Sequence, residues 1–392
     1  MAGWIGPLAA FWWVLATLVL VASVVGAGVR RRKPARPEPP ITDFSVIAPM
    51  VGVGDATPQY VECLRDLAAA GAEVLICVES ADDPACSAVR NIWPEATILA
   101  GVSDVSFNPK VNNIAKGLAA FQHALCAVCD SGSLIRVADL RAMGAELGDG
   151  VGLVEALKPP SQPENWAAEL ECAILNGHQA RWLICADRLG IKGACGGVLL
   201  LSRETLDRIG GAAGFSVEIA EDHALLTSVR ALGLTSRISD VTPVYPRPHR
   251  NWTDVWMRQV RWARLRRLLS PLSMLLEAAF GFLAALAAAC LAAPWIAAGM
   301  GFPAADPLLA GLLAALLHGA VWIAAERIFL AARGWHWSAR HALAILLRET
   351  LLPVMVLHSL TGNAIEWRGI DVVGGWRRHR ARAMASRGGN GS

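Results

Sequence analysis

The amino-acid sequence predicts an α/β domain, built on a mostly parallel β-sheet, that is flanked by membrane-spanning helices. Runs without charged residues lie towards both ends of the chain, at 1–29, 278–305, 307–325 and 350–365. Segment 41–270 lies between the first two runs and holds most of the acidic residues. Within it, short apolar runs alternate with stretches of helical periodicity, which is typical of parallel sheets covered by helices on both faces.

Composition excludes several classes of protein. Hydrophobic residues make up 54% of the 392 residues and charged residues only 18%, whereas an ordinary soluble domain is about 25% charged. A simple water-soluble globule and a disordered chain are therefore excluded. The net charge of +3 is too small to indicate a nucleic-acid-binding protein. The chain has 15 Trp but only 2 Tyr, and Trp favours membrane interfaces.

The N-terminal segment 1–29 predicts a transmembrane helix. A bilayer span needs about 20 apolar residues, and residues 7–28 meet this requirement. A cleaved signal peptide carries positive charge before its apolar core, whereas here the charges follow it, at Arg30, Arg31, Arg32, Lys33 and Arg36. The positive-inside rule therefore places residue 30 onwards in the cytoplasm. Segment 30–40 is predicted to be a basic, proline-rich linker.

Two further spans are predicted at 274–298 and 307–330, as a transmembrane hairpin over 271–332. Segment 342–361 is ambiguous, because Arg348 and Glu349 interrupt it and Pro353 would kink it. A full crossing would also put the last arginines of the chain outside, against the charge rule. We therefore predict that 333–392 contains a re-entrant or interfacial helix followed by a basic C-terminal tail on the cytoplasmic side.

Strands of the predicted sheet are expected at 44–49, 73–78, 96–100, 124–129, 151–154 and 197–201, with helices at 60–70 and 111–123. Ligands of such sheets bind beyond the carboxyl ends of the strands, so polar residues that follow each apolar run are the candidates for function. Cys126 and Cys129 form a C-x-x-C sequence inside a predicted strand, where residues i and i+3 point to opposite faces. They are therefore interpreted as packing residues.

Two of the predicted strands are followed by carboxylates. Glu79 and Asp82 come after strand 73–78, where a carboxylate can bind a nucleoside base or ribose, or simply form a solvated turn. Asp130 follows strand 124–129, where it can hold a divalent cation that bridges two phosphates. An Asx-type turn is the alternative interpretation of Asp130.

Two predicted helix starts carry further candidates. Lys110 stands beside amide side chains at the start of helix 111–123, a place that suits a phosphate or a helix cap. Asp222 opens another helix, where it can act as the general base for an acceptor hydroxyl or as a capping residue.

Segment 251–270 predicts a basic amphipathic helix that lies at the membrane interface. Arg258, Arg261 and Trp262 have i, i+3, i+4 spacing and so share one helix face. The two guanidinium groups can neutralise a departing diphosphate, and Trp262 can stack on a sugar or line an acceptor pocket. Plain anchoring on anionic lipid is the alternative, and both interpretations can hold together.

The order of these features resembles the membrane glycosyltransferases with a GT-A fold. More narrowly, the chain is similar to the ceramide glucosyltransferase family, which is also similar to bacterial hopanoid-associated glycosyltransferases. The resemblance spans roughly 40–270 and implies a GT-A domain over 41–250. It is carried by NPKVNN at 108–113, CDSG at 129–132, GHQARW at 177–182, GGVLLLSRETLDRIGG at 196–211, IAEDHAL at 219–225 and RQVRW at 258–262.

The resemblance also implies an activity. It implies inverting transfer of a sugar, glucose from UDP-glucose above all, to the hydroxyl of a membrane lipid such as ceramide. Asp130 would bind Mg²⁺ or Mn²⁺ and the diphosphate, and Asp222 would be the catalytic base. The RQVRW residues would meet the diphosphate and the acceptor. His178 falls where the family has a His linked to the active site, and it would bind the acceptor. The expected protein is integral to a bacterial inner membrane, with a cytoplasmic catalytic domain and no nucleic-acid partner.

One departure from the family concerns the residue just after the second strand. The family usually has an Asp where this chain has Ser80, so that Glu79 or Asp82 would replace it. Four alternatives follow from these features: a hopanoid acceptor, a diacylglycerol acceptor, a processive polysaccharide synthase, and an inactive membrane scaffold in which Ser80 marks the lost function.

Overall fold

The computed structural model describes residues 4–32, 36–191, 193–216, 220–302 and 306–362, and the backbone of two short strands, β10 (Glu366–Trp367) and β11 (Ile370–Asp371). Most of the predicted basic tail, beyond residue 371, and part of the predicted linker, 33–35, lie outside the described residues. The chain divides into two compact units. The sheet unit comprises Arg31–Ser161, Leu189–Arg247 and Ala364–Ser392, and the helical unit comprises Met1–Arg30, Gln162–Arg188 and Pro248–Asn363.

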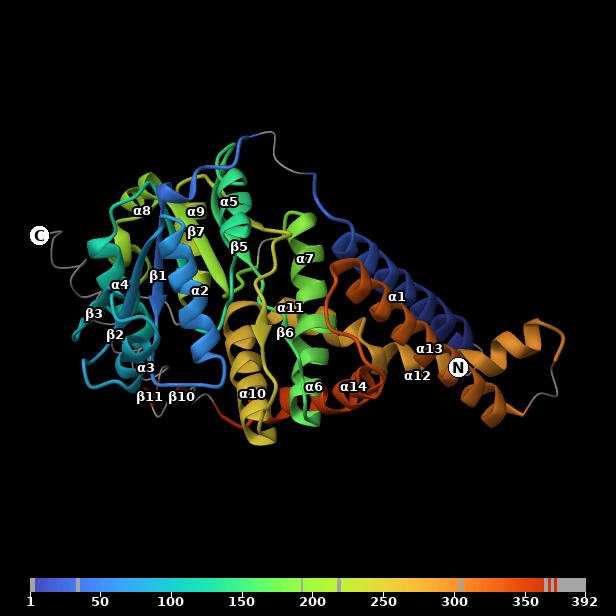
Figure 1. Cartoon of the computed structure of the whole chain (residues 1–392). Helices are drawn as coiled ribbons and strands as arrows, with labels where there is room; N and C mark the ends of the chain where they lie inside the picture. Colours follow the sequence, from blue (N-terminus) through green and yellow to red (C-terminus); the bar gives the residue numbers. More distant parts are fainter. Residues whose placement is uncertain are drawn as a thin grey trace, which may run out of the picture. The chain divides into compact units, whose positions relative to one another are not determined.

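A seven-stranded sheet forms the centre of the sheet unit, in the order β3-β2-β1-β4-β7-β5-β8 (Figure 1). Its strands are β1 (Phe44–Pro49), β2 (Glu73–Val78), β3 (Ile98–Ala100), β4 (Leu125–Cys129), β5 (Val151–Ala156), β7 (Val198–Ser202) and β8 (Thr235–Ile238). Strand β7 is antiparallel to both of its neighbours, and the other pairings are parallel. The predicted α/β fold with a mostly parallel sheet is confirmed.

Helices cover both faces of the sheet. Successive residues of a strand point to opposite faces, so neighbouring residues of β1 pack with different helices. Val46 and Ala48 pack with helices α2 (Thr57–Ala69), α3 (Pro84–Ile92) and α5 (Val137–Ala145). Ile47 packs with α4 (Pro109–Ala120), α8 (Arg203–Arg208) and α9 (Glu221–Ala231) on the other face. Cys129 belongs to the first of these two cores and Cys126 to the second, so the C-x-x-C pair is a packing feature, as predicted.

Helices α2 and α4 begin earlier than their apolar periodicity predicts. Each has a proline in its first turn, where the missing N–H costs no hydrogen bond. In α4 the side chain of Asn108 also accepts a hydrogen bond from the Lys110 backbone N–H at 3.0 Å. Capping therefore brings Lys110 onto the first turn of the helix. Two short strands, β6 (Pro160–Ser161) and β9 (Tyr245–Pro246), pair with each other outside the main sheet.

Several chain segments meet at one edge of the sheet because of the directions of its strands. The parallel strands β1, β2, β4 and β5 end at this edge, and the antiparallel β7 begins there. Gly197 stands just before β7, and a Cβ atom on it would lie 2.3 Å from the carbonyl oxygen of Ala156. The Gly197 carbonyl in turn accepts a hydrogen bond from the Asp130 N–H at 2.9 Å. Only a glycine lets these three segments approach so closely.

The helical unit consists of helices from three parts of the sequence. They are α1 (Ile5–Gly28), α6 (Trp166–Cys172), the π-helical η3 (Ala173–Ala180), α7 (Arg181–Arg188), α10 (Trp252–Leu269), α11 (Pro271–Ala279), α12 (Phe282–Gly299), α13 (Pro307–Arg333) and α14 (Ala339–Leu360). Helix α1 packs against α12 and α13 (Figure 1). Segment 162–188, which lies inside the predicted 41–250 domain, packs within this unit.

Within the part of the chain that the structure describes, four helical segments are long and apolar enough to cross a bilayer: Ile5–Gly28, Pro271–Gly299, Pro307–Arg333 and Ala339–Leu360. Helix α13 also leaves a broad leucine face exposed, made of Leu308, Leu309, Leu312, Leu313, Leu316 and Leu317. A continuous apolar face of this kind is unfavourable in water and suits lipid. These helices indicate a membrane protein.

The ambiguous segment 342–361 falls in helix α14, which includes Pro353. Arg348 and Glu349, which interrupt its apolar run, are paired inside the unit. The Arg348 guanidinium donates hydrogen bonds at 2.8 Å to both carboxylate oxygens of Glu326, and it also pairs with Glu349. Charged residues among membrane helices are expected to pair in this way. The re-entrant or interfacial placement of this helix stays a prediction.

We predict that Gly197→Ala destabilises the protein, because the new methyl group would collide with the Ala156 carbonyl oxygen. Overpacking of this kind costs about 1–3 kcal/mol. Trp fluorescence during thermal unfolding in detergent measures the effect. The matched control is Gly54→Ala in the same unit, because Gly54 is exposed and a Cβ there meets no atom within 4 Å. Equal midpoints for the two variants would refute the close approach.

Candidate active site

Asp130 stands at the end of β4, in the turn predicted from the CDSG sequence. Its carbonyl accepts a hydrogen bond from the Ser133 N–H at 3.0 Å. Gly132 has a φ of +85°, and a Cβ on it would lie 3.1 Å from the ring of Tyr245, so the turn requires glycine at this position. The backbone therefore forms the turn, and the Asp130 carboxylate is left for other partners.

Two lysines bind that carboxylate, one on each oxygen. Lys110 Nζ pairs with Asp130 Oδ1 and also with Glu221 Oε1, and Lys158 Nζ pairs with Asp130 Oδ2. The four side chains are only 13–18% exposed. Burial by itself raises the pKa of Asp130, but the two ammonium groups outweigh it and hold that pKa below its usual value. Asp130 is therefore a permanent anion between two cations.

Asp222 lies in the first turn of α9, and its Oδ1 accepts a hydrogen bond from the His223 N–H at 2.7 Å. A Cβ on Gly196 would lie 3.5 Å from Asp222 Oδ2 and 3.7 Å from Asp130 Oδ2. Both carboxylates therefore border the same glycine. Burial, and then the charge of Glu221, raise the pKa of Asp222 to about 6. The predicted Asp130 and Asp222 are thus brought together, with pKa values shifted in opposite directions.

This arrangement separates two chemical roles. The ammonium groups of Lys110 and Lys158 are hydrogen-bond donors that suit the phosphates of a substrate, while in this structure Asp130 and Glu221 balance their charge. A carboxylate with a pKa near the working pH, such as that of Asp222, is suited to accept a proton in a reaction. Asp130 fixes the two lysines, so the cationic and the basic parts of the site meet at one edge of the sheet.

The site also has the donors that a hard divalent cation needs. Mg²⁺ and Mn²⁺ prefer oxygen ligands, and Mg²⁺ commonly uses one or two carboxylates together with substrate phosphates. Asp130 supplies two carboxylate oxygens, and the carboxylate of Asp222 is close by across Gly196. The residues present therefore fit such an ion, with Asp130 as the principal ligand. One of the lysines would then give up its contact with Asp130.

The predicted nucleoside carboxylates, Glu79 and Asp82, are exposed and follow β2. The Asp82 N–H donates to Ser80 Oγ at 3.1 Å, so Ser80 stabilises the turn. Strand β2 is two strands away from β4, which places its end about 10 Å along the same edge. This spacing suits a nucleoside attached to a diphosphate at Asp130. The role of Glu79 and Asp82 stays a prediction.

Asp83, the neighbour of Asp82, is a residue that sequence reasoning missed. Its Oδ1 accepts hydrogen bonds at 2.8 Å from the backbone N–H groups of Gly52 and Ala85. It therefore ties the loop after β1 to the start of α3. Asp83 and the proline after it form a common capping sequence at the start of α3, and this sequence could have identified Asp83.

Lys158 is the most important residue that sequence reasoning missed. It follows β5 by two residues, so it satisfies the same rule that selected Asp130, namely a polar residue after an apolar run. Its contact with Asp130 could not be read from the sequence, because the strand β7 lies between β4 and β5.

The RQVRW residues belong to the helical unit and lie on helix α10, so the predicted helix is present, while its place at the membrane interface stays a prediction. Arg258 Nη1 donates to Glu171 Oε1 at 2.9 Å, and its guanidinium carbon lies 4.5 Å from the centre of the Trp262 ring. Arg261 is half-buried on the same helix. Glu171 on α6 is fully buried and also pairs with Arg250 at 2.8 Å. The contacts of the two arginines with the buried Glu171 were not predicted.

His178 also belongs to the helical unit, in the π-helical segment η3. Its Nε2 lies 3.4 Å from Glu277 Oε2, a carboxylate oxygen that also accepts a hydrogen bond from Arg266 at 2.8 Å. A π-helical turn inside a helix is uncommon and often marks a functional segment. The predicted link of His178 to the acceptor site stays a prediction.

Comparison with known proteins decides the family. The sequence profile described as glycosyl transferase family 21 matches residues 10–375. The chain belongs to glycosyl transferase family 21. Among curated relatives, this family member is 25% identical over 248 residues to ceramide glucosyltransferase 1 of Caenorhabditis elegans, covering 62% of this chain and 53% of that protein. It is 24% identical over 240 residues to ceramide glucosyltransferase 3, covering 59% and 52%. The chain thus spans about half the length of these relatives.

Among solved structures, this family 21 chain is similar to a mannosyltransferase from Pyrobaculum calidifontis in complex with GDP-mannose and Mn²⁺. The TM-score is 0.50 and the identity 17%, covering 89% of this chain and 99% of the other. At that identity the similarity concerns the fold alone. It agrees with the predicted GT-A-like fold, and the predicted resemblance to ceramide glucosyltransferases is confirmed by the family match.

We predict that catalysis by this family 21 protein increases with pH through an ionisation near pH 6. The pKa of Asp222 is raised to about 6, and only its ionised form, present above that pH, can accept a proton. The pH profile of kcat/KM measures the ionisation. In Glu221→Gln the acidic limb should move to lower pH, because the negative charge that raises the pKa of Asp222 is removed. An acidic limb at the same pH in both proteins would contradict this assignment.

Proposed function

We propose that this protein transfers a glucosyl residue from UDP-glucose to the hydroxyl group of ceramide and inverts the configuration at the anomeric carbon. One observation carries the proposal. The carboxylates of Asp130 and Asp222 both border Gly196, and the carboxylate of Asp130 is held between two lysines. The names of the curated relatives support the choice of glucose and ceramide.

The reaction needs one base and a place for the diphosphate. Asp222 takes the proton of the acceptor hydroxyl while its oxygen attacks the anomeric carbon. The bond between that carbon and the diphosphate oxygen breaks, and UDP leaves with the electron pair. A single displacement of this kind inverts the configuration. A Mg²⁺ or Mn²⁺ ion held by Asp130 would supply further positive charge for the diphosphate.

The other predicted site residues are given binding roles in this proposal. Lys110 and Lys158 bind the diphosphate oxygens, and Glu79 or Asp82 binds the nucleoside. Arg258 and Arg261 stabilise the leaving UDP, with Arg258 already oriented by Glu171 and by the ring of Trp262. Trp262 and His178 belong to the acceptor side of the reaction. The motif sequences that contain Lys110, His178 and the RQVRW residues support the roles of those residues.

The acceptor explains the membrane helices. A ceramide keeps its tails in the bilayer, so its hydroxyl can meet a water-soluble donor only at the interface. The basic, Trp-containing helix α10 has the composition of an interfacial helix. We place the protein in a bacterial inner membrane with the sheet unit in the cytoplasm, because the positive charges of 30–36 follow the first span.

A product assay tests the proposed function directly. Purified protein in detergent receives Mg²⁺ or Mn²⁺, a panel of UDP-sugars, and ceramide, hopanoid and diacylglycerol acceptors, and mass spectrometry detects the products. We expect a hexosylceramide formed from UDP-glucose. A sugar on another lipid would overturn the acceptor, and a polymer would favour a processive synthase. UDP-glucose binding without any product would favour the inactive scaffold suggested by Ser80.

We predict that Asp222→Asn lowers the transfer rate by about 10²–10⁴-fold, which is the usual contribution of a general base. Binding of UDP-glucose, measured by calorimetry, should survive, because the amide keeps the size of the carboxylate. Glu204→Gln is the matched control, since Glu204 is an exposed acid in the first turn of α8 of the same unit. Normal turnover by Asp222→Asn would remove the base assignment.

A further inference from the structure

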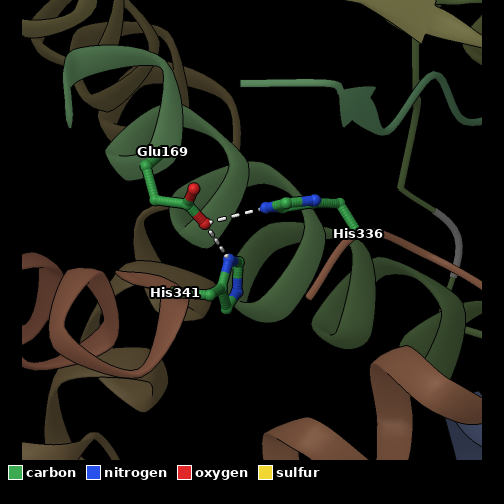
Figure 2. Close-up of side chains that lie close together, drawn as sticks. All are labelled: Glu169, His336 and His341. Atoms are coloured by element: carbon green, nitrogen blue, oxygen red, sulfur yellow. Dashed lines mark hydrogen bonds and ion pairs between the residues drawn. The ribbon is translucent and has the colours of Figure 1, made fainter. Parts of the chain in front are cut away.

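A second group of ionisable side chains lies inside the helical unit and takes no part in the proposed reaction. Glu169 on α6, His336 in the turn after α13, and His341 at the start of α14 point towards one another (Figure 2). Glu169 Oε1 lies 2.9 Å from His336 Nε2 and 3.0 Å from His341 Nδ1. The three atoms all lie within 4.8 Å of one another. We call this group the Glu169 cluster.

The geometry of the Glu169 cluster points to a binding site for a divalent transition-metal ion of the zinc type, with one carboxylate and two imidazole ligands. This set of ligands is one that zinc uses in proteins, with three protein ligands and a fourth position for water. Imidazole ligands favour Zn²⁺ over Mg²⁺ and Ca²⁺, which prefer oxygen. The site is thus chemically different from the oxygen site proposed at Asp130.

The distances need little adjustment to hold such an ion. Tetrahedral zinc with bonds of about 2.0–2.1 Å would separate its ligand atoms by about 3.3 Å. The two distances from Glu169 Oε1, 2.9 and 3.0 Å, are only slightly shorter. The third separation, between the two histidine nitrogens, is at most 4.8 Å. Small shifts of the three side chains would therefore bring their ligand atoms to the spacing that the ion needs.

The surroundings of His341 supply the outer support that metal-binding histidines usually have. Its ring presents Nδ1 to the cluster, and Nε2 faces Glu326 Oε1 at 3.7 Å. This separation is that of an ion pair and is longer than a hydrogen bond, but a carboxylate that faces the far nitrogen of a ligating imidazole helps to orient the ring. Glu326 is itself fixed by both of its hydrogen bonds to Arg348. His341 and Glu169 are buried, with side-chain exposures of 0% and 3%.

The three ligands are also positioned by rigid segments. The Ser338 hydroxyl accepts a hydrogen bond from the His341 N–H at 3.1 Å and so caps α14. Gly334, with a φ of +69°, ends α13 and begins the turn that carries His336. The imidazole of His336 is 21% exposed, which leaves a path for the ion. A bound ion would cross-link α6 to α14 and to the turn that joins α13 and α14.

Metal content and cobalt spectroscopy of the full-length protein in detergent test the proposal. Protein grown with zinc and purified without chelator is expected to contain about one zinc per chain, measured by mass spectrometry of the metal. After removal of zinc, Co²⁺ should give the visible absorption bands of a tetrahedral site. The titration is repeated in Asp130→Asn, which removes the ion site proposed in the sheet unit.

Two histidine variants make the test specific. His336→Ala should lose the zinc and the cobalt bands, and it replaces the most exposed ligand, so that folding is least affected. His249→Ala is the matched control, because His249 also faces a carboxylate, Glu164, at 3.4 Å, but both side chains are more than 60% exposed. This variant should keep the metal. Near-ultraviolet circular dichroism compares the folds of the variants.

X-ray absorption of the zinc-loaded wild-type protein gives a result that does not depend on any variant. Nitrogen and oxygen ligands at about 2.0–2.1 Å, with the multiple scattering of two imidazoles, are expected. Wild-type protein that contains no zinc and binds no Co²⁺ would overturn the proposal, and the cluster would then be a hydrogen-bonded carboxylate. Zinc retained by His336→Ala would overturn it as well.

Discussion

The ion pairs of Asp130 with Lys110 and Lys158 are the interaction on which the sheet unit depends for its chemistry. Each oxygen of the carboxylate has its own ammonium group, and all three side chains are largely buried. Removing Asp130 would leave two buried ammonium groups without the carboxylate that they share, which is costly. The lysines come from α4 and from the chain after β5, so the pairs exist only because the sheet brings β4 and β5 to either side of β7. The strand order of the sheet therefore creates the site.

The helical unit also contains charged residues, and these are paired among apolar helices. Arg348 is bound by Glu326 and Glu349, and Arg333 donates to the carbonyl of Ala27 at 2.8 Å. Such pairing lets charged residues remain among helices that are suited to a bilayer. The same unit fixes Arg258 through the buried Glu171. These charged groups are thus paired within the unit, and the Glu169 cluster meets the same network where His341 faces Glu326.

The sequence predicted the elements of the fold better than their connections. Asp130 and Asp222 were found because each stands where a strand ends or a helix begins, a place that the local pattern reveals. The direction of β7 was not predicted, since an apolar run has the same periodicity in either direction. The partners of Lys158 and Glu171 were missed for a similar reason. Glu171 and Arg258 are 87 positions apart, and only packing of the helices brings them together.

The central claim is that the edge of the sheet around Asp130 binds the diphosphate of the sugar donor. A structure of the protein with UDP-glucose and Mn²⁺, with the ion located by its anomalous scattering, tests this claim most directly. The account predicts manganese bonded to a carboxylate oxygen of Asp130, with donor phosphates bound by Lys110 or Lys158 and Asp222 facing the anomeric carbon. Manganese and donor bound away from Asp130 would contradict it.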